Sequence, residues 1–362
     1  MSVTQGVSCM DKKLFRILVL CLIIQISSGI SFAGRGDKAG SAAAPQLLIP
    51  VGVRSIALGG STLATATGIE AIYWNPAGLT RSSHNSSAMF THMNYIADIG
   101  IEYLAVSSTF SGLGTIGLSI KSLSLGDIPI TTEDQPDGTG EIASPTFITI
   151  GGTLSRLVAD RVAIGITMNL IAERMERVSS SGIAFNIGLQ YTGVGGIPGL
   201  DLGVVVKNIG PQMQYDGPGL LRTGNIDDVL RPGSFYQVQA ASAELPSVME
   251  MGLGYTFSLS SSDQLIASAM FQNNNFSDDE YKLGAEYLYA NIMNGIDFAL
   301  RSGYNIVSKS LEGENIFSGT YAWSFGTGIQ ARTGDVDITV DYADRAVQYF
   351  GGNHVIGIGL GF

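Results

Sequence analysis

From about residue 86 onward, apolar and polar side chains alternate along the chain with a period of two. In VMEMGLGYTF (248–257), the odd positions from Met249 to Phe257 are apolar, and the even positions from Glu250 to Thr256 are small or polar. YAWSFGTGIQ (321–330) and VDITVDYAD (336–344) show the same alternation. This pattern predicts β-strands with one apolar face and one polar face.

The connections between these strands fall into two groups. We expect fourteen strands, at 86–93, 99–110, 115–127, 145–157, 161–175, 183–192, 201–209, 247–258, 264–272, 279–290, 296–306, 320–332, 336–347 and 353–362. Every second connection is short, namely 111–114, 158–160, 193–200, 259–263, 291–295 and 333–335. The intervening set includes the long polar segments 128–144, 210–246 and 307–319. Short turns at one end and long loops at the other are typical of an outer-membrane barrel.

The composition of the polar face favours the same class. It is rich in Gly, Ser, Thr and Asn, whereas the surface of a soluble sandwich would carry many Lys and Glu side chains. Aromatic residues recur near the expected strand ends, as in the girdles of a membrane barrel: Tyr103, Phe110, Tyr191, Tyr255, Phe257, Tyr287 and Tyr289. The sequence therefore predicts an all-β, antiparallel, up-and-down transmembrane β-barrel over residues 86–362, with both of its ends on the periplasmic side.

The N-terminus predicts export. Lys12, Lys13 and Arg16 precede an apolar run over 17–26, and SFA at 31–33 offers a signal-peptidase site, so residues 1–33 are expected to be a cleaved signal peptide. A membrane anchor and a lipoprotein site at Cys21 are weaker alternatives, because the apolar run is short and Leu20 is bulky. After residue 33 no run approaches the ~18 apolar residues of a transmembrane helix.

Charge and cysteine content restrict the remaining chemistry. Charged residues make up 14% of the chain, and the formal net charge is −11. An acidic chain is a poor match for nucleic acid, which is bound through clustered Lys and Arg. Both cysteines, Cys9 and Cys21, lie in the expected signal peptide, so the mature chain uses no disulfide.

Residues 34–85 lack sustained alternation and are expected to form a plug inside the barrel. The stretch YWNPAG (73–78) has the chemistry of a rigid turn. Pro76 moves Asn75 out of helical geometry, Asn75 can cap the turn, and Gly78 permits positive φ or close backbone approach. Tyr73 and Trp74 add large apolar area. We expect a structural and gating role, with ligand contact by Tyr73 or Trp74 as the alternative.

The stretch GVRSIALGGSTLATATGIEAIYWNPAGL (52–79) resembles the N-terminal signature of the PorV/PorQ family, within the wider FadL-like outer-membrane barrels. Arg54, Gly59, Gly60 and the run 74–79 carry the resemblance. In the family an acidic pair often follows the Ala-rich run, whereas here only Glu70 does. The resemblance implies a fourteen-stranded barrel with an N-terminal hatch. It further implies a surface component of type IX-like protein secretion that binds cargo or machinery. The alternative is a FadL-like channel for hydrophobic small molecules such as long-chain fatty acids, and a purely structural role is a third.

Motifs of catalysis and cofactor binding are weak. The histidines, His84, His92 and His354, form no His-Glu-x-x-His motif, and no Gly-x-Ser-x-Gly elbow occurs. GTGIQA (326–331) lies within an alternating strand, where its glycines suit a crowded lumen better than a nucleotide. We predict no enzyme activity, no cofactor and no metal. A Ser-His or Asp-His pair at the barrel rim would favour an enzyme.

Two acidic loops leave calcium binding open. They supply oxygen ligands from Glu133, Asp134 and Asp137 and from Asp278, Asp279 and Glu280.

The remaining candidate residues concern partners. The long connection 210–246 is expected to face outward and to offer Leu220, Leu221, Phe235 and Tyr236 to a partner. The chain closes on NHVIGIGLGF, and Phe362 resembles the signal that the barrel-assembly machinery recognises. Expected partners are therefore outer-membrane lipid, that machinery, secretion components or cargo, and a hydrophobic small molecule.

Overall fold

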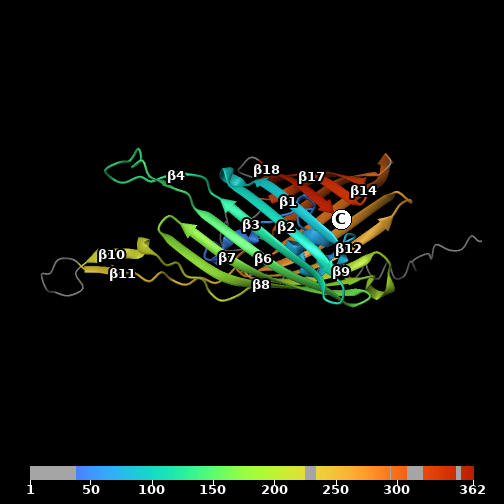
Figure 1. Cartoon of the computed structure of the whole chain (residues 1–362), viewed down its shortest axis with the longest axis horizontal. Coiled ribbons are helices and arrows are strands. Elements are labelled where there is room, and N and C mark those ends of the chain that lie inside the picture. Colours follow the sequence, from blue (N-terminus) through green and yellow to red (C-terminus); the bar gives the residue numbers. More distant parts are fainter. Residues whose placement is uncertain (1–37, 225–233, 294, 308–320, 348–351) are drawn as a thin grey trace, which may run out of the picture. The chain divides into compact units, whose positions relative to one another are not determined.

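Fourteen strands pair antiparallel with their neighbours and close into a barrel (Figure 1). The computed structural model describes residues 38–224, 234–293, 295–307, 321–347 and 352–362; the expected signal peptide lies outside them. The barrel strands are β1 (Ser86–Asn94), β2 (Gly100–Phe110), β3 (Gly114–Ser124), β6 (Thr146–Ala159), β7 (Val162–Met175), β8 (Val178–Thr192), β9 (Leu200–Ile209), β12 (Val248–Ser258), β13 (Asp263–Asn274), β14 (Glu280–Met293), β15 (Ile296–Val307), β16 (Tyr321–Thr333), β17 (Val336–Val347) and β18 (Asn353–Gly361). The predicted fold class is confirmed.

The barrel closes between its first and last strands. In this seam Phe90 of β1 lies opposite Ile358 of β18. The backbone N–H of Phe362 donates to the carbonyl of Ser86 at 2.9 Å, so Phe362 continues the ladder beyond β18. Each neighbouring pair in the circle thus satisfies its backbone groups, which leaves no open sheet edge.

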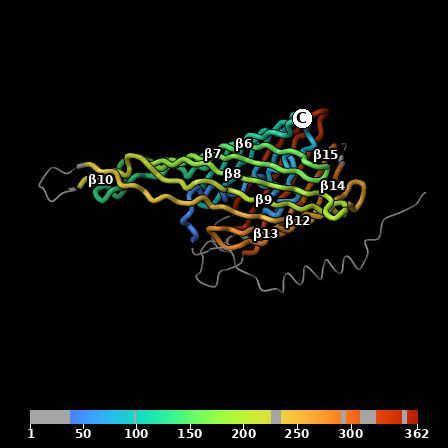
Figure 2. The backbone as a smooth tube through the Cα atoms, turned by 90° about the horizontal axis from the view of Figure 1, so that it is seen from below, coloured from blue at the N-terminus to red at the C-terminus, as the bar shows by residue number. Residues whose placement is uncertain are grey.

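Two hairpins extend beyond one end of the barrel, which we call the loop end (Figures 1 and 2). They pair β4 (Ile128–Pro129) with β5 (Ile142–Ala143), and β10 (Leu221–Gly224) with β11 (Ser234–Gln237). The opposite end, the turn end, carries the short connections β2–β3, β6–β7, β12–β13 and β16–β17. The segregation of long and short connections is as expected, and the long polar segments 128–144 and 210–246 contain these hairpins.

The sequence prediction was wrong for residues 176–182. β8 begins at Val178, so a two-residue turn at Glu176 and Arg177 joins β7 to β8 at the loop end. Glu176 adopts a φ of 44° to make this turn. The expected connection 307–319 lies almost entirely outside the described residues.

Apolar side chains cover the outer face of the wall, and its inner face is largely polar, with apolar side chains such as Leu123 and Phe147 in the cluster packed with the plug. On β7, for example, Ile164, Ile166 and Met168 are exposed, whereas Thr167 and Asn169 are buried. One predicted girdle residue departs from this rule. Tyr103 is buried and shares the inner face of β2 with Ile101 and Ala105, because strand parity and not aromatic character decides where a side chain points.

The residues before β1 form short helical turns that pack against the inner wall. They are η2 (Pro45–Leu48), α2 (Val53–Ala57), η3 (Thr62–Ala64), η4 (Gly68–Glu70), α3 (Ala71–Trp74) and η5 (Pro76–Arg81). We call residues 45–81 the plug. Its side chains Leu58, Leu63 and Leu79 are almost fully buried. No helix in the described part of the chain is long and apolar enough to cross a membrane.

Candidate functional site

Glycine occupies the wall wherever the backbone of the plug approaches it most closely. A Cβ added to Gly303 would lie 2.1 Å from the backbone nitrogen of Gly59, and one added to Gly165 would lie 2.3 Å from the carbonyl carbon of Pro76. An added Cβ would also come within 3.0 Å of plug atoms at Gly117, Gly188, Gly203, Gly252, Gly254, Gly284, Gly326 and Gly357. The plug can therefore sit against most of the wall because these positions have no side chain.

Trp74 holds the centre of the plug together. It is 3% exposed, and its Nε1 donates to the carbonyl of Val51 at 2.9 Å. Its ring packs over Gly60, where φ is +80° and an added Cβ would lie 3.0 Å from the ring. The ring of Tyr73 meets it edge-on at a centroid distance of 5.2 Å. Gly59 and Gly60 thus provide positive φ and space where the plug turns.

Asn75 joins the plug to the wall. Its side chain is fully buried, and Nδ2 donates to the carbonyls of Leu63 in the plug and Leu189 in β8, both at 3.1 Å. Its Oδ1 accepts the N–H of Ala77 at 3.2 Å, which caps η5. A Cβ on Gly78 would lie 2.1 Å from the carbonyl of Ala66. The turn chemistry expected for this motif is present, and its close approach explains Gly78 without positive φ.

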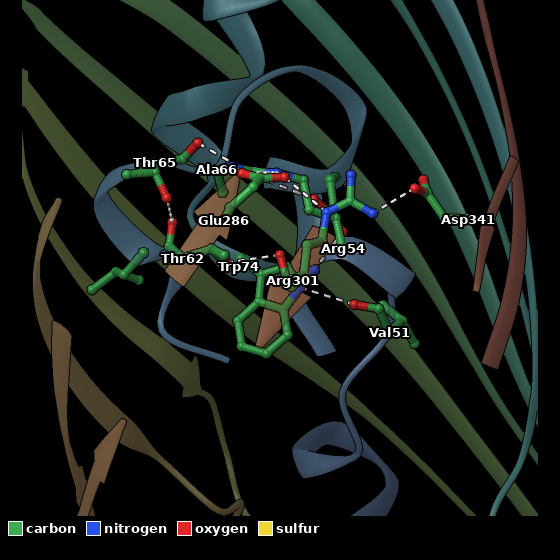
Figure 3. A network of polar contacts seen from close by, with 12 residues as sticks. Val51, Arg54, Thr62, Thr65, Ala66, Trp74, Glu286, Arg301 and Asp341 are labelled. Atoms are coloured by element: carbon green, nitrogen blue, oxygen red, sulfur yellow. Dashed lines mark hydrogen bonds and ion pairs between the residues drawn. The ribbon is translucent and has the colours of Figure 1, made fainter. Parts of the chain in front are cut away.

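Arg54 connects the plug to the wall through charge (Figure 3). Its guanidinium contacts both carboxylate oxygens of Glu286, with the shortest distance 2.6 Å from Nη2 to Oε2. Arg301 donates to the same carboxylate at 2.8 Å and to Asp341 at 2.6 Å. Glu286 is 1% exposed. Paired guanidinium groups are what allows a carboxylate to be buried there.

Burial and pairing act in opposite directions on these charges. Burial by itself lowers the pKa of Arg54, but Glu286 and Glu70 outweigh it, so the pKa lies above its usual value and the group stays charged. For Glu70, burial raises the pKa despite Arg54, whose Nη1 lies 3.8 Å from Glu70 Oε2. Glu70 also accepts the N–H of Ser55 at 3.0 Å.

The plug contributes to the lining of two cavities of similar size. The cavity toward the loop end, which we call the loop-side cavity, has a volume of about 500 Å³. Apolar side chains dominate its lining, including Tyr73, Trp74, Leu123 and Phe147. Two ion pairs lie in the lining: Lys207 with Glu250 at 2.7 Å, and Lys282 with Glu280 at 3.1 Å. An apolar body with a polar end would fit this lining.

The cavity toward the turn end, the turn-side cavity, has a volume of about 510 Å³ and a different chemistry. Its lining includes Arg54, Glu70, Arg81, Asp201 and Asp341. Apolar side chains such as Ile69 and Leu288 also line it, but its charged groups suit water and ions better than a hydrocarbon. The two faces of the plug therefore meet different environments.

The expected partner residues lie together at the loop end. Leu221 belongs to β10, whereas Phe235 and Tyr236 belong to β11. In the pairing of these two strands, Phe235 lies opposite Thr223 and Tyr236 lies opposite Arg222. Phe235 is 76% exposed, and Leu221 and Tyr236 are also exposed. Leu220 ends η8 (Pro218–Leu220) and is half-buried.

The turn-end rim holds a serine, a histidine and an aspartate in contact. Ser83 Oγ lies 3.1 Å from His84 Nδ1, and His84 Nε2 lies 2.8 Å from Asp337 Oδ2. The pair that would favour an enzyme is thus present. The imidazole also covers Gly361, where an added Cβ would lie 2.6 Å from three ring atoms. We assign His84 to packing across the barrel seam, and the lack of enzyme activity stays a prediction.

The acidic loops do not converge on a metal site. Asp279 accepts a hydrogen bond from Asn273 at 2.8 Å, and Glu280 is held by Asn305 and Lys282, so these carboxylates are already engaged. Glu133 and Asp134 are exposed between β4 and β5. Within the described ranges, no group of three or more His, Cys, Asp or Glu side chains could hold a metal ion.

Sequence reasoning missed the wall residues that face the plug. Glu286, Arg301, Asp341, Lys207 and Lys121 all occupy inward positions of barrel strands. The available signal was a charge on the polar face of an alternating strand. That signal marks a lumen residue but does not identify its partner, which can be 232 residues away, as for Arg54 and Glu286.

The barrel is similar in fold to several solved structures. The P. putida toluene transporter TodX matches with a TM-score of 0.55 and 12% identity, over 86% of this chain and 99% of that one. The Ralstonia pickettii toluene transporter TbuX matches at 0.53 and 13%, over 86% and 98%. The CymD monoaromatic hydrocarbon channel matches at 0.51 and 12%, over 86% and 97%.

The sequence comparisons name no family. No protein-family model matches this chain, and no curated protein matches it. A Pseudomonas aeruginosa FadL homologue also matches in structure, with a TM-score of 0.49 and 10% identity over 89% of this chain and 99% of that one. At these identities the comparisons establish the fold alone. No comparison supports the narrower PorV/PorQ resemblance.

Proposed function

We propose that this chain is an outer-membrane channel that admits hydrophobic small molecules through its loop end. The observation that carries the proposal is the loop-side cavity, whose volume of about 500 Å³ lies within the range of small-molecule sites. Its apolar lining can replace water around a hydrocarbon body. The barrels that share the fold include transporters of toluene, which is a ligand of this class.

The outer face supports a position in a membrane. Apolar side chains such as Leu118 of β3, Ile166 of β7 and Leu253 of β12 are exposed on the outer face of the wall, which lipid would cover. We place the turn end in the periplasm and the loop end outside the cell, as in other barrels of this type. Residues 1–33 would direct export, and Phe362, exposed where the barrel closes, would be available to the assembly machinery.

Binding in the loop-side cavity can be tested directly. A fluorescent long-chain fatty acid bound to the purified barrel in mild detergent should be displaced by toluene or by oleate. Leu125 lines the cavity, so Leu125→Glu should weaken binding of both ligands at least tenfold by placing a charge against the apolar body. The matched control is Leu113→Glu, an exposed leucine in the β2–β3 turn, which should bind normally. If Leu125→Glu bound both ligands as tightly as Leu113→Glu and the unmodified barrel, the loop-side cavity would be excluded as the binding site.

A second candidate is a surface component of protein secretion of the PorV type, which binds cargo or machinery. The observation that favours it is Phe235, whose exposed ring on the β10–β11 hairpin has the character of an interface anchor. Mass spectrometry of proteins and lipids that co-purify with the barrel distinguishes the two. Secretion proteins lost on Phe235→Ser, with no bound hydrophobe, would favour this candidate. A bound hydrophobe with no protein partner would favour the channel.

A further inference from the structure

A small polar chamber lies behind Tyr73, between the plug and the wall. Its volume is about 30 Å³, which is the space of one water molecule or one monatomic ion. The wall supplies hydrogen-bond donors from neighbouring strands, namely Lys121, Ser119, Thr149, Asn169 and Lys207. The plug closes the chamber with Leu47, Ile72 and Tyr73.

The charge around this chamber is positive. Lys121 is 6% exposed, and its Nζ donates to the carbonyl of Ile49 at 2.6 Å and lies 5.0 Å from the centre of the Tyr73 ring. Lys207 lies at the same distance from that ring, but Glu250 neutralises it at 2.7 Å. No carboxylate lines the chamber, and among the described residues none forms an ion pair with Lys121.

Two features of the chamber call for an occupant. A buried ammonium without a counter-charge is costly, and a carbonyl and an aromatic face compensate only part of that cost. Thr149 is 7% exposed, and its Oγ1 is buried without a hydrogen-bond partner among the described residues. Buried hydroxyl groups are rarely left in this state.

We propose that the chamber binds one monatomic anion of the size of chloride. The ion would accept hydrogen bonds from Lys121 Nζ and Thr149 Oγ1 and would supply the counter-charge that the protein lacks there. Because Lys121 also holds Ile49 and Tyr73 of the plug, the bound ion would strengthen the attachment of the plug to β3. The small volume of the chamber favours a monatomic anion over a larger one.

Halide dependence of stability tests the proposal. The barrel in detergent is melted while chloride or bromide replaces gluconate at constant ionic strength. We expect a saturable rise of the melting temperature by a few degrees, as for any ligand that binds only the folded state. Lys121→Met should abolish the rise. Lys282→Met is the matched control, because Lys282 lines the loop-side cavity and pairs with Glu280; it should retain the rise.

Diffraction from crystals of the unmodified protein grown in bromide provides a second measurement. If it disagrees with the melting experiment, the diffraction result decides whether the chamber binds an anion. An anomalous peak beside Lys121 Nζ and Thr149 Oγ1 would support the site even if Lys121→Met fails to fold. A water molecule there, with no bromide signal, would overturn the proposal and would indicate that Lys121 is buried in its neutral form. The result does not depend on which solute the loop-side cavity binds.

Discussion

At the scale of single residues, Trp74 is the side chain on which the plug depends most. Trp74→Ala removes the hydrogen bond to Val51, the contact with Tyr73 and the packing over Gly60. Truncating a buried aromatic residue costs about 3–5 kcal/mol. We expect this loss to destabilise the plug and not the wall, because the strands of the wall are hydrogen-bonded to one another without the plug. Trypsin should then cut after Arg54, which the seated plug protects, at a much higher rate.

Trp74→Phe is a milder change at the same position. It keeps an aromatic ring but loses the hydrogen bond to Val51 and part of the indole packing over Gly60, so the loss should be smaller than for Trp74→Ala and trypsin cleavage should rise modestly. If both variants were cut as slowly as the unmodified chain, Trp74 would not anchor the plug. A loss of ligand binding with unchanged cleavage would instead favour the alternative role of Trp74 in contacting ligand.

The residue types of the plug motif could be interpreted from sequence, but their partners could not. A Pro after an Asn predicts a capped turn at Asn75, and the structure shows that cap. The link from Asn75 to Leu189 depends on how the barrel closes, which local sequence does not specify. The same holds for Arg54: Glu286 and Arg301 face each other in the β14–β15 hairpin, but Arg54 of the plug meets them only when the plug is seated in the barrel.

At the scale of elements, the inward glycines determine how closely the strands approach the plug. Gly188→Ala in β8 would put a Cβ 2.1 Å from Asn75 Oδ1, where the fully buried amide has no room to move. We expect a loss of about 1–3 kcal/mol, as for overpacked cores, and a plug that trypsin reaches more easily.

Gly152→Ala in β6 is the matched control for that substitution. Its added Cβ would meet nothing within 4 Å, because Gly152 faces outward from the wall. The variant should behave as the unmodified barrel in thermal melting and in proteolysis. Equal effects of the two substitutions would mean that glycine matters there for strand conformation and not for the approach of the plug.

Strands were predicted correctly where large apolar and small or polar residues alternate clearly, and were missed where the outer face carries no apolar side chains. β12 and β16 alternate large apolar and small residues, so the period of two is plain. β8 begins with VSSS, in which both faces carry small polar residues, and the alternation disappears although the ladder with β7 continues. The β4–β5 and β10–β11 hairpins are too short to show a period at all.

At the scale of the whole molecule, the barrel and the plug contribute different properties. The wall closes through antiparallel pairs from β1 to β18 and needs no hydrogen bond from the plug to complete its ladder. The plug, by contrast, consists of short turns that could not bury their apolar residues without the wall. The barrel should therefore form without the plug, whereas the plug should not fold without the barrel.

Replacing residues 45–81 by a short Gly-Ser linker should convert the closed barrel into an open pore. Water would then reach inward charges such as Lys207, Glu250 and Glu286, which the plug now covers, and a hydrated charged lumen conducts ions. Single-channel recording in planar bilayers should show a steady conductance well above that of the full chain. Deleting the β10–β11 hairpin, 221–237, is the matched control and should leave conductance low, because that hairpin lies outside the lumen. If the linker variant inserted as a closed barrel with no added conductance, the wall and not the plug would be what closes this channel.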